Sequence, residues 1–209
     1  MKKKKADIPS DLQLEGFISL VEKDEKYGLR NSVIIHLSYY AGLRAKEISA
    51  LDMSDIYTAD GDVKHEAFVD TKGDGGREIL LQEPRLRSVL SKYYEVRNLS
   101  AIPNKKVQYQ VVNRSLILSR EMNRMSANAI AHLLLRLYKL HGLWNEDIRC
   151  SSHSGRRYFA TRLADVVSNT KELMAHGGWK SANVALEYVE VAKSKLKSNI
   201  ARAFTKEEK

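Results

Sequence analysis

The sequence has 209 residues and a formal net charge of +9, with 43% hydrophobic and 29% charged residues. This composition supports a folded core and excludes a disordered chain, and a single cysteine excludes both a disulfide framework and a zinc site built from cysteines. No apolar run approaches the roughly 18–20 residues that span a bilayer, and no apolar stretch typical of a secretory signal follows the basic start. We therefore expect a cytoplasmic protein.

The positive charge is unevenly distributed along the chain. Residues 1–104 carry 16 basic and 17 acidic side chains, whereas residues 105–209 carry 19 basic and 9 acidic ones. Such an asymmetry is typical of proteins that bind a polyanion, most often nucleic acid. A general charge excess that keeps the protein soluble explains the numbers equally well, so both interpretations stay open at this point.

Taken in chain order, the apolar spacing and capping residues predict a mainly helical protein with a small antiparallel β-sheet. Residues 55–82 are expected to form strands, including a hairpin of residues 66–72 and 77–82 around a glycine-rich turn, and residues 116–118 a further short strand. The stretch 99–113 has no pattern and is expected to be a loop. Helices are expected at about residues 10–27, 31–41, 44–51, 84–98, 126–141, 153–167, 170–176, 181–189 and 192–204.

Several basic side chains occupy special backbone positions. Arg44 follows the helix-ending Gly42 and opens a new helix, where it would add to the anion site of a helix N-terminus, although a surface ion pair with Glu47 explains it as well. Lys72 stands just before the glycine-rich turn, where it could reach a ligand and donate a proton, or simply face solvent.

A second group of candidates lies in the basic half. His153 and Arg156, three residues apart at a helix start, share one face and could bind a phosphate, but a capping histidine beside a surface arginine is equally plausible. Tyr188 could act as a nucleophile if cations lower its pKa, although its spacing from Val184 also suits a core residue. The sequence contains no phosphate-binding glycine loop, no HExxH metal motif and no GxSxG elbow.

Taken together, four segments resemble the boxes of the tyrosine recombinase, or phage integrase, catalytic domain. They occur in the family's order over about residues 14–191, nearly the whole chain. The segments are AGLRAKEISALDMSDI (41–56), TKGDGGREILL (71–81), HSGRRYFATRLAD (153–165) and LMAHGGWKSANVALEYVEV (173–191). Four boxes in the right order outweigh the independent explanations of the single residues.

The resemblance implies a reaction and a set of residues. It implies a site-specific recombinase or integrase that cuts and rejoins duplex DNA through a 3′-phosphotyrosyl intermediate, without metal or other cofactor. The implied catalytic residues are Arg44, Lys72, His153, Arg156, Trp179 and Tyr188. Trp179 lies nine residues before the tyrosine, as in the Cre-like form of the last box. Glu47 and His176 are candidates for supporting contacts, and Arg157 and Lys180 for contacts to DNA.

The resemblance also implies an organisation and partners. We expect a basic flexible arm at residues 1–8, a catalytic domain at 9–191 and a tail helix at 192–209, without the additional N-terminal DNA-binding domain of most family members. The implied partners are double-stranded DNA and three further copies of the chain in a tetramer on paired sites, with an accessory DNA-bending protein as a further candidate. A bacterial or phage mobile element and a nucleoid location fit this interpretation.

Three alternatives are kept. The first is a catalytically silent DNA-binding regulator of recombinase ancestry. The second is a topoisomerase-like enzyme that relaxes DNA without exchanging partners. The third, a helical protein–protein module, leaves the basic half and the four boxes unexplained.

Overall fold

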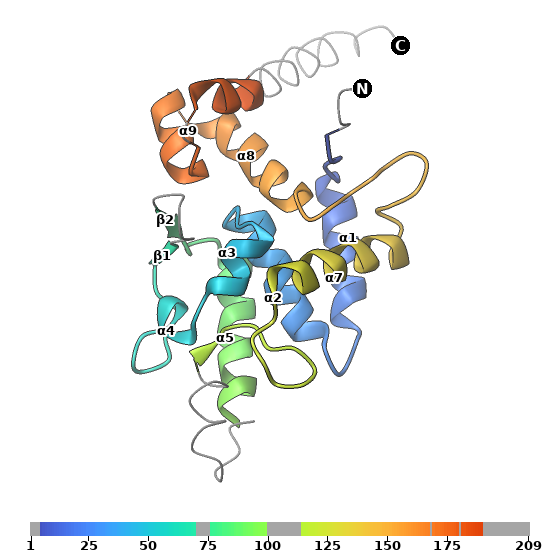
Figure 1. Cartoon of the computed structure of the whole chain (residues 1–209), viewed down its shortest axis with the longest axis vertical. Coiled ribbons are helices and arrows are strands. Elements are labelled where there is room, and N and C mark those ends of the chain that lie inside the picture. The colour runs from blue at the N-terminus through green and yellow to red at the C-terminus, as the bar shows by residue number, and fades with distance from the viewer. Residues whose placement is uncertain (1–4, 70–75, 100–113, 168, 180, 190–209) are drawn as a thin grey trace, which may run out of the picture.

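The computed structural model describes residues 5–69, 76–99, 114–167, 169–179 and 181–189 (Figure 1). Most of these residues are helical, and the expected class, mainly α with a small antiparallel sheet, is confirmed. No helix in these ranges is long and apolar enough to cross a membrane. The helices are α1 (Asp11–Glu22), α2 (Gly28–Tyr40), α3 (Ala45–Ala50), α4 (Met53–Ile56), α5 (Pro84–Leu99), α7 (Ala127–Leu140), α8 (Ser154–Val166) and α9 (Thr170–Gly177), and residues 182–189 form one more helical segment.

The first helix begins where the sequence predicts and ends earlier. Ser10 caps α1, because its Oγ accepts a hydrogen bond from the Gln13 amide (3.3 Å) and the Gln13 side chain accepts one from the Ser10 amide (2.9 Å). The predicted continuation to residue 27 is wrong. The Asp24 carboxylate accepts from the amides of Lys26 (3.0 Å) and Tyr27 (3.1 Å) and closes a turn there instead.

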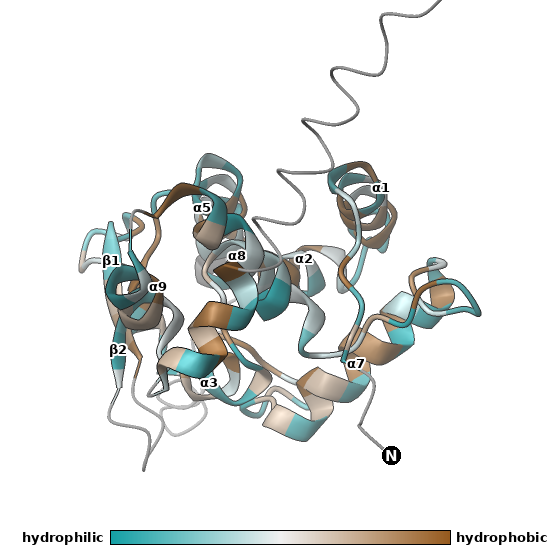
Figure 2. Ribbon diagram, turned by 90° about the horizontal axis from the view of Figure 1, so that it is seen from above, coloured by the Kyte–Doolittle hydropathy of each residue, from teal (hydrophilic) through white to brown (hydrophobic). Residues whose placement is uncertain are grey.

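Helix α2 forms the centre of the core. Its side chains are buried almost all round, including Val33, Ile34, Ile35 and Leu37, each with an exposed fraction of 0%. Helices α1, α5 and α8 pack around it. In Figure 2 helix α7, which packs against α3, carries both hydrophobic (brown) and hydrophilic (teal) segments, as expected for a helix with one buried face.

The predicted hairpin is present as two short strands. Strand β1 (Glu66–Val69) pairs antiparallel with β2 (Arg77–Leu80), in a register that places Val69 opposite Arg77. The expectation of strands from residue 55 onward is wrong at its start, where α4 forms. The Asp55 carboxylate accepts a hydrogen bond from the Asp52 amide (2.7 Å) and so stabilises that helical turn.

The prediction of a short strand at residues 116–118 is also wrong. Instead of a strand, the segment has an isolated bridge just before it, between Asp52 and Ser115, and another at its last residue, between Leu118 and Arg124. The segment is nevertheless core, because Leu116 and Ile117 are buried.

Two packing contacts bring the C-terminal elements onto the rest of the molecule. Helix α8 crosses α2 where a Cβ on Gly155 would lie only 2.2 Å from the Ser38 Oγ, so glycine permits the close approach. Helix α9 packs against β2. As a result α8, α9 and residues 182–189 gather at one end of the molecule, above the hairpin and α3 (Figure 1).

Candidate active site

The corner between α2 and α3 positions Arg44. Gly42 has φ +65°, a left-handed conformation, and a Cβ there would lie 2.3 Å from the Phe159 Cδ1. The sharp turn places Arg44 at the N-cap of α3, with its side chain 35% exposed. Its guanidinium therefore reaches the surface from the start of a helix, as the sequence predicts.

Glu47 lies at the centre of an arginine cluster. Its side chain is only 5% exposed and accepts hydrogen bonds from the Arg44 amide (2.6 Å) and the Arg44 Nη1 (3.3 Å). Its Oε2 also lies 3.4 Å from the Arg77 Nη2 and 3.7 Å from the Arg156 Nη1. One carboxylate thus serves three guanidiniums, which fits the supporting contact expected of it.

Helix α8 contributes His153, Arg156 and Arg157 from its first turns. His153 is the N-cap residue, its amide donates to the Ser151 Oγ (3.3 Å), and its side chain is exposed. Arg156 is 6% exposed, and Arg157 donates a hydrogen bond to the carbonyl of Ala6. The two main candidates of the box therefore differ in environment, with the His153 imidazole on the surface and Arg156 buried.

Arg156 is held by backbone carbonyls from two distant segments. Its Nη1 donates to the Gly42 carbonyl (3.0 Å), and its Nη2 donates to the Gly177 carbonyl at the end of α9. Burial, followed by the positive charges of Arg44 and Arg77, lowers the pKa of Arg156 to about 10. Arg156 still carries its charge at neutral pH, in surroundings that favour an added anion.

The end of α9 places Trp179 over this arginine. Gly178 ends the helix in the left-handed conformation, φ +60°, and the Trp179 ring centroid lies 5.4 Å from the Arg156 guanidinium. The ring of Tyr188, from residues 182–189, stacks on Trp179 with centroids 5.0 Å apart and an angle of 24°. The indole thus bridges the arginine and the tyrosine.

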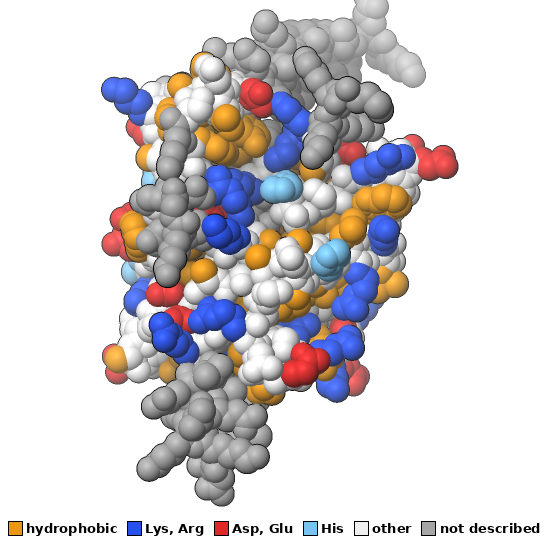
Figure 3. Space-filling view, in the orientation of Figure 1, with side chains coloured by type: hydrophobic (Ala, Val, Ile, Leu, Met, Phe, Trp, Pro, Cys, Tyr) orange, Lys and Arg blue, Asp and Glu red, His pale blue; other side chains and the backbone are white. Residues whose placement is uncertain are grey.

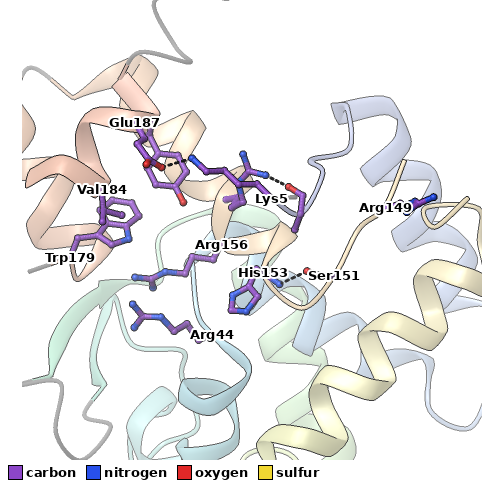
Figure 4. A pocket seen from close by; sticks show the side chains of 12 residues that line it. Lys5, Arg44, Arg149, Ser151, His153, Arg156, Trp179, Val184 and Glu187 are labelled. Atoms are coloured by element: carbon purple, nitrogen blue, oxygen red, sulfur yellow. Dashed lines mark hydrogen bonds and ion pairs between the residues drawn. The ribbon is translucent and has the colours of Figure 1, made fainter. Parts of the chain in front are cut away.

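These side chains meet in one open pocket of about 750 Å³. Figure 4 shows Arg44 and Arg156 extending side by side below Trp179, with His153 beside them. On the surface, Lys and Arg side chains gather next to a histidine on this face, below the C-terminal elements (Figure 3). The sequence-predicted residues that line the pocket are Arg44, His153, Arg156, Arg157, Trp179 and Tyr188.

The N-terminal segment borders the same pocket. Lys5 and Ala6 line it, and the Lys5 Nζ pairs with the Glu187 carboxylate at 2.5 Å, next to Tyr188 in the chain. This hydrogen bond holds the pKa of Glu187 below its ordinary value. Arg149, in the segment before α8, is a further cation in the lining.

Of the predicted residues that the structure describes, Glu47 and His176 do not line the pocket. Lys72 and Lys180 lie outside the described residues, Lys72 three positions after the end of β1. His176 contributes its backbone rather than its ring, since its carbonyl accepts a hydrogen bond from the Arg77 Nη1 (2.8 Å). A supporting contact thus exists at this position, made by an atom that every residue type carries.

Arg77 is a site residue that motif reasoning missed. It is 8% exposed and also donates to the Gly42 carbonyl (3.1 Å), so it shares two partners, Gly42 and Glu47, with Arg156. The signal was present in the alternation of β2, where Arg77 and Ile79 are buried and Glu78 and Leu80 face outward. Because Arg77 and Ile79 share one face of the strand, an inward Ile79 predicts an inward arginine.

The arginine cluster has an excess of positive charge. Among the described residues, Arg44, Arg77 and Arg156 bring three charges to the single carboxylate of Glu47. An anion placed between Arg44 and Arg156 would offset this imbalance and accept charge-assisted hydrogen bonds from both. Within the described residues no group of three or more His, Cys, Asp or Glu side chains could hold a metal ion. The site is therefore best suited to a phosphate-like group beside a tyrosine hydroxyl.

Comparison with known proteins assigns the chain to a family. The sequence profile of the phage integrase family matches residues 11–195. The chain is 25% identical over 202 residues to the tyrosine recombinase XerC of Syntrophus aciditrophicus (strain SB), covering 95% of this chain and 62% of the relative. It is 27% identical over 203 residues to the tyrosine recombinase XerD of Rickettsia conorii (strain ATCC VR-613 / Malish 7), covering 94% and 63%.

Solved structures show the same fold. The XerA recombinase superposes with a TM-score of 0.73 at 19% identity, over 96% of this chain and 66% of that one. The XerH site-specific recombinase, in a post-cleavage complex with its palindromic difH substrate, gives a TM-score of 0.70 at 21% identity, over 95% and 53%. The chain spans less than two thirds of the length of these curated XerC and XerD relatives. The profile match over most of its length shows that this chain belongs to the phage integrase family.

Proposed function

We propose that this protein is a site-specific DNA recombinase that breaks and rejoins duplex DNA through a 3′-phosphotyrosyl intermediate. The observation that carries the proposal is the stack of Tyr188 on Trp179, directly over Arg156, in a pocket that Arg44 and His153 also line. A phosphate between the two arginines would lie near the tyrosine, which is the arrangement that a nucleophilic attack on phosphorus requires.

Each side chain has a role that its position supports. Arg44 and Arg156 bind the non-bridging oxygens of the phosphate, where negative charge grows in the transition state. Trp179 donates its indole N–H to the same phosphate and holds the tyrosine ring. Removing one such charged contact should cost roughly 2–4 kcal/mol of transition-state stabilisation.

Proton transfer completes the reaction. The Tyr188 oxygen gives its proton to His153 and forms a bond to phosphorus as the bond to the 5′-oxygen breaks, and Lys72 protonates that leaving oxygen. His153, exposed at the N-cap of α8, assists proton transfer and positions the phosphate. The 5′-hydroxyl of a partner strand then reverses the step. Because the protein–DNA ester conserves the energy of the phosphodiester, the exchange requires neither a nucleotide nor a metal.

Duplex DNA is the proposed substrate, because the pocket opens on a face where basic side chains gather (Figure 3). Lys5, Arg149 and Arg157 line the pocket rim, and we assign Arg157 and Lys180 to backbone contacts. We further propose a catalytic domain at residues 9–191, a basic arm at 1–8 and a tail helix at 192–209 that docks on a neighbouring copy, with four copies on two DNA sites. Two contacts support an arm that lies along the domain: the Arg149 amide donates a hydrogen bond to the Asp7 carboxylate (2.8 Å), and Arg157 donates one to the Ala6 carbonyl.

A covalent trap with DNA of randomised sequence tests the proposal and recovers the target site in the same experiment. The protein is incubated with a pool of nicked suicide duplexes, from which the short fragment that carries the freed 5′-hydroxyl diffuses away after cleavage. Adducts that survive SDS are isolated and their DNA is sequenced. We expect an adduct through the 3′ end of the DNA, enriched for one sequence, and none with Tyr188→Phe.

Other outcomes assign the alternatives. Sequence-selective DNA binding by the wild-type protein with no adduct from any pool would contradict the proposal and favour a silent regulator. An adduct together with relaxation of supercoiled plasmid, but no exchange between two labelled duplexes, would favour a topoisomerase-like enzyme.

A further inference from the structure

Arg77 is a buried arginine at the start of β2. We propose that Arg77, which lies outside the pocket lining, is a positioning residue of the reaction proposed above: it fixes the end of α9, and with it Trp179, against the Glu47 carboxylate that orients Arg44 and Arg156. The inference rests on the proposed function for its kinetic consequences, but its structural consequence can be measured without DNA.

Arg77 joins three segments that are far apart in the sequence. From β2 it donates to the Gly42 carbonyl at the α2–α3 corner (3.1 Å) and to the His176 carbonyl in the last turn of α9 (2.8 Å). Its Nη2 also lies 3.4 Å from the Glu47 Oε2. The planar guanidinium can satisfy these acceptors together because its donors point in fixed, divergent directions.

Arg77 and Arg156 both hold the end of α9 against the α2–α3 corner. Both donate to the Gly42 carbonyl and both pair with Glu47, and they hold consecutive carbonyls of α9, those of His176 and Gly177. Arg156 also lines the pocket and has to bind the substrate phosphate, whereas Arg77 does not line it. When Arg156 turns its donors toward a phosphate, Arg77 can still hold His176, three residues before Trp179, and so keep the end of α9 in place.

The surrounding structure makes room for this arginine. A Cβ on Gly178 would lie 2.3 Å from the Arg77 Cδ, so the residue that ends α9 in a left-handed conformation also admits the side chain. The position is costly, because burial lowers the pKa of Arg77 and its Nε is buried without a hydrogen-bond partner among the described residues. Retaining a buried polar atom without a partner beside a site is more typical of a functional role than of one in stability alone.

A simple stabilising role is the competing explanation, and the chain offers a matched control. Arg87, on α5, also donates to three backbone carbonyls, those of Lys64 (2.9 Å), Leu81 (3.0 Å) and Val63 (2.8 Å). It anchors the other end of the same hairpin, and these three hydrogen bonds involve neither Glu47 nor α9. Arg87→Met therefore removes an arginine that donates to three backbone carbonyls, as Arg77→Met removes one that donates to two, but it leaves the contacts of the site in place.

The test compares Arg77→Met, Arg77→Lys and Arg87→Met in a Trp144→Phe background, where Trp179 is the remaining tryptophan of the chain's two. Acrylamide quenching of Trp179 is measured without DNA. Single-turnover cleavage at saturating DNA and the Kd for the uncut duplex are measured with the sequence recovered from the covalent trap. These readouts separate the position of Trp179 from DNA affinity and from the chemical step.

For Arg77→Met we expect quenching of Trp179 to rise and cleavage to slow by about 100-fold, while the Kd stays within about threefold, because a misplaced group costs rate rather than binding. Arg77→Lys should also be slow, since one ammonium cannot hold both carbonyls, and it carries the comparison if Arg77→Met does not fold. Arg87→Met should leave quenching and the cleavage rate unchanged.

Cleavage by Arg77→Met at the wild-type rate, full recovery in Arg77→Lys, or equal losses in Arg87→Met would each overturn the proposal. If the wild-type protein forms no adduct with any duplex, the proposed function has failed. The quenching comparison then still decides whether Arg77 positions Trp179.

Discussion

Glu47 is the residue whose replacement tests the arginine cluster most sharply. Glu47→Gln removes a carboxylate that pairs with three guanidiniums, whose nitrogens lie 3.3 Å (Arg44), 3.4 Å (Arg77) and 3.7 Å (Arg156) from its oxygens. It also turns one acceptor into an amide donor that faces other donors. The variant should therefore be less stable than the wild-type protein.

The size of the loss follows from burial. Removing one partner of a buried ion pair costs about 3–5 kcal/mol, and we expect the lower end because the Arg44 side chain is 35% exposed. For a domain of this size about 3 kcal/mol lowers the Tm by roughly 6–12 °C. Sulfate should restore part of this loss by binding between the arginines, and a sulfate concentration ten times its Kd would contribute about 1.4 kcal/mol.

The assay is thermal unfolding followed by circular dichroism, in sodium chloride and in sodium sulfate of equal ionic strength. Glu15→Gln is the matched control, because Glu15 pairs with Arg85 on the surface, where both side chains are more than half exposed. The Tm of Glu15→Gln should equal that of the wild-type protein, and its rise in sulfate measures the general stabilisation by this salt. The reasoning is refuted if Glu47→Gln melts within about 1 °C of wild type, or gains no more from sulfate than Glu15→Gln does.

Three further predictions concern other parts of the chain. Gly42→Ala should lower the Tm, because its Cβ would lie 2.3 Å from the Phe159 ring at φ +65°; an unchanged melting curve would contradict the tight corner. Lys72→Ala should slow cleavage of normal DNA but not of a duplex with sulfur at the 5′-bridging position, since a thiolate leaves without a proton; single-turnover rates on both substrates check this. Burial lowers the pKa of His36, so the unfolded chain binds its proton more readily and stability should fall as the pH drops through about 6.5, the ordinary value. His36→Asn should flatten this decline in Tm, and an equally steep decline in the variant would count against it.

Local signals predicted much of this molecule. Capping and apolar spacing located α1, α7 and α8, and the four boxes brought together side chains that lie up to 144 positions apart, from Arg44 to Tyr188. The hairpin followed from strand alternation around glycines. The helices and the hairpin depend on neighbours in sequence, which is why a sequence reveals them, whereas the grouping of distant side chains came from the resemblance to the family.

The supporting contacts could not be predicted in the same way. Whether Glu47 serves one arginine or three depends on how β2 and α8 pack against α3. The part played by His176 is a backbone carbonyl, which leaves no mark on residue identity. The sequence analysis assigned no role to Arg77, because its contacts to α9 and to the α2–α3 corner arise only when these distant segments pack against β2.

The position of the covalent bond is the most direct test of the whole account. The chain has ten tyrosines, and trypsin should release residues 181–193, SANVALEYVEVAK, in which Tyr188 is the one tyrosine. Adducts from the covalent trap are digested with nuclease and trypsin and analysed by mass spectrometry. We predict a 3′-linked nucleotide remnant on this peptide, at Tyr188. A remnant on any other residue would contradict the assignment of the nucleophile and of the pocket built around it.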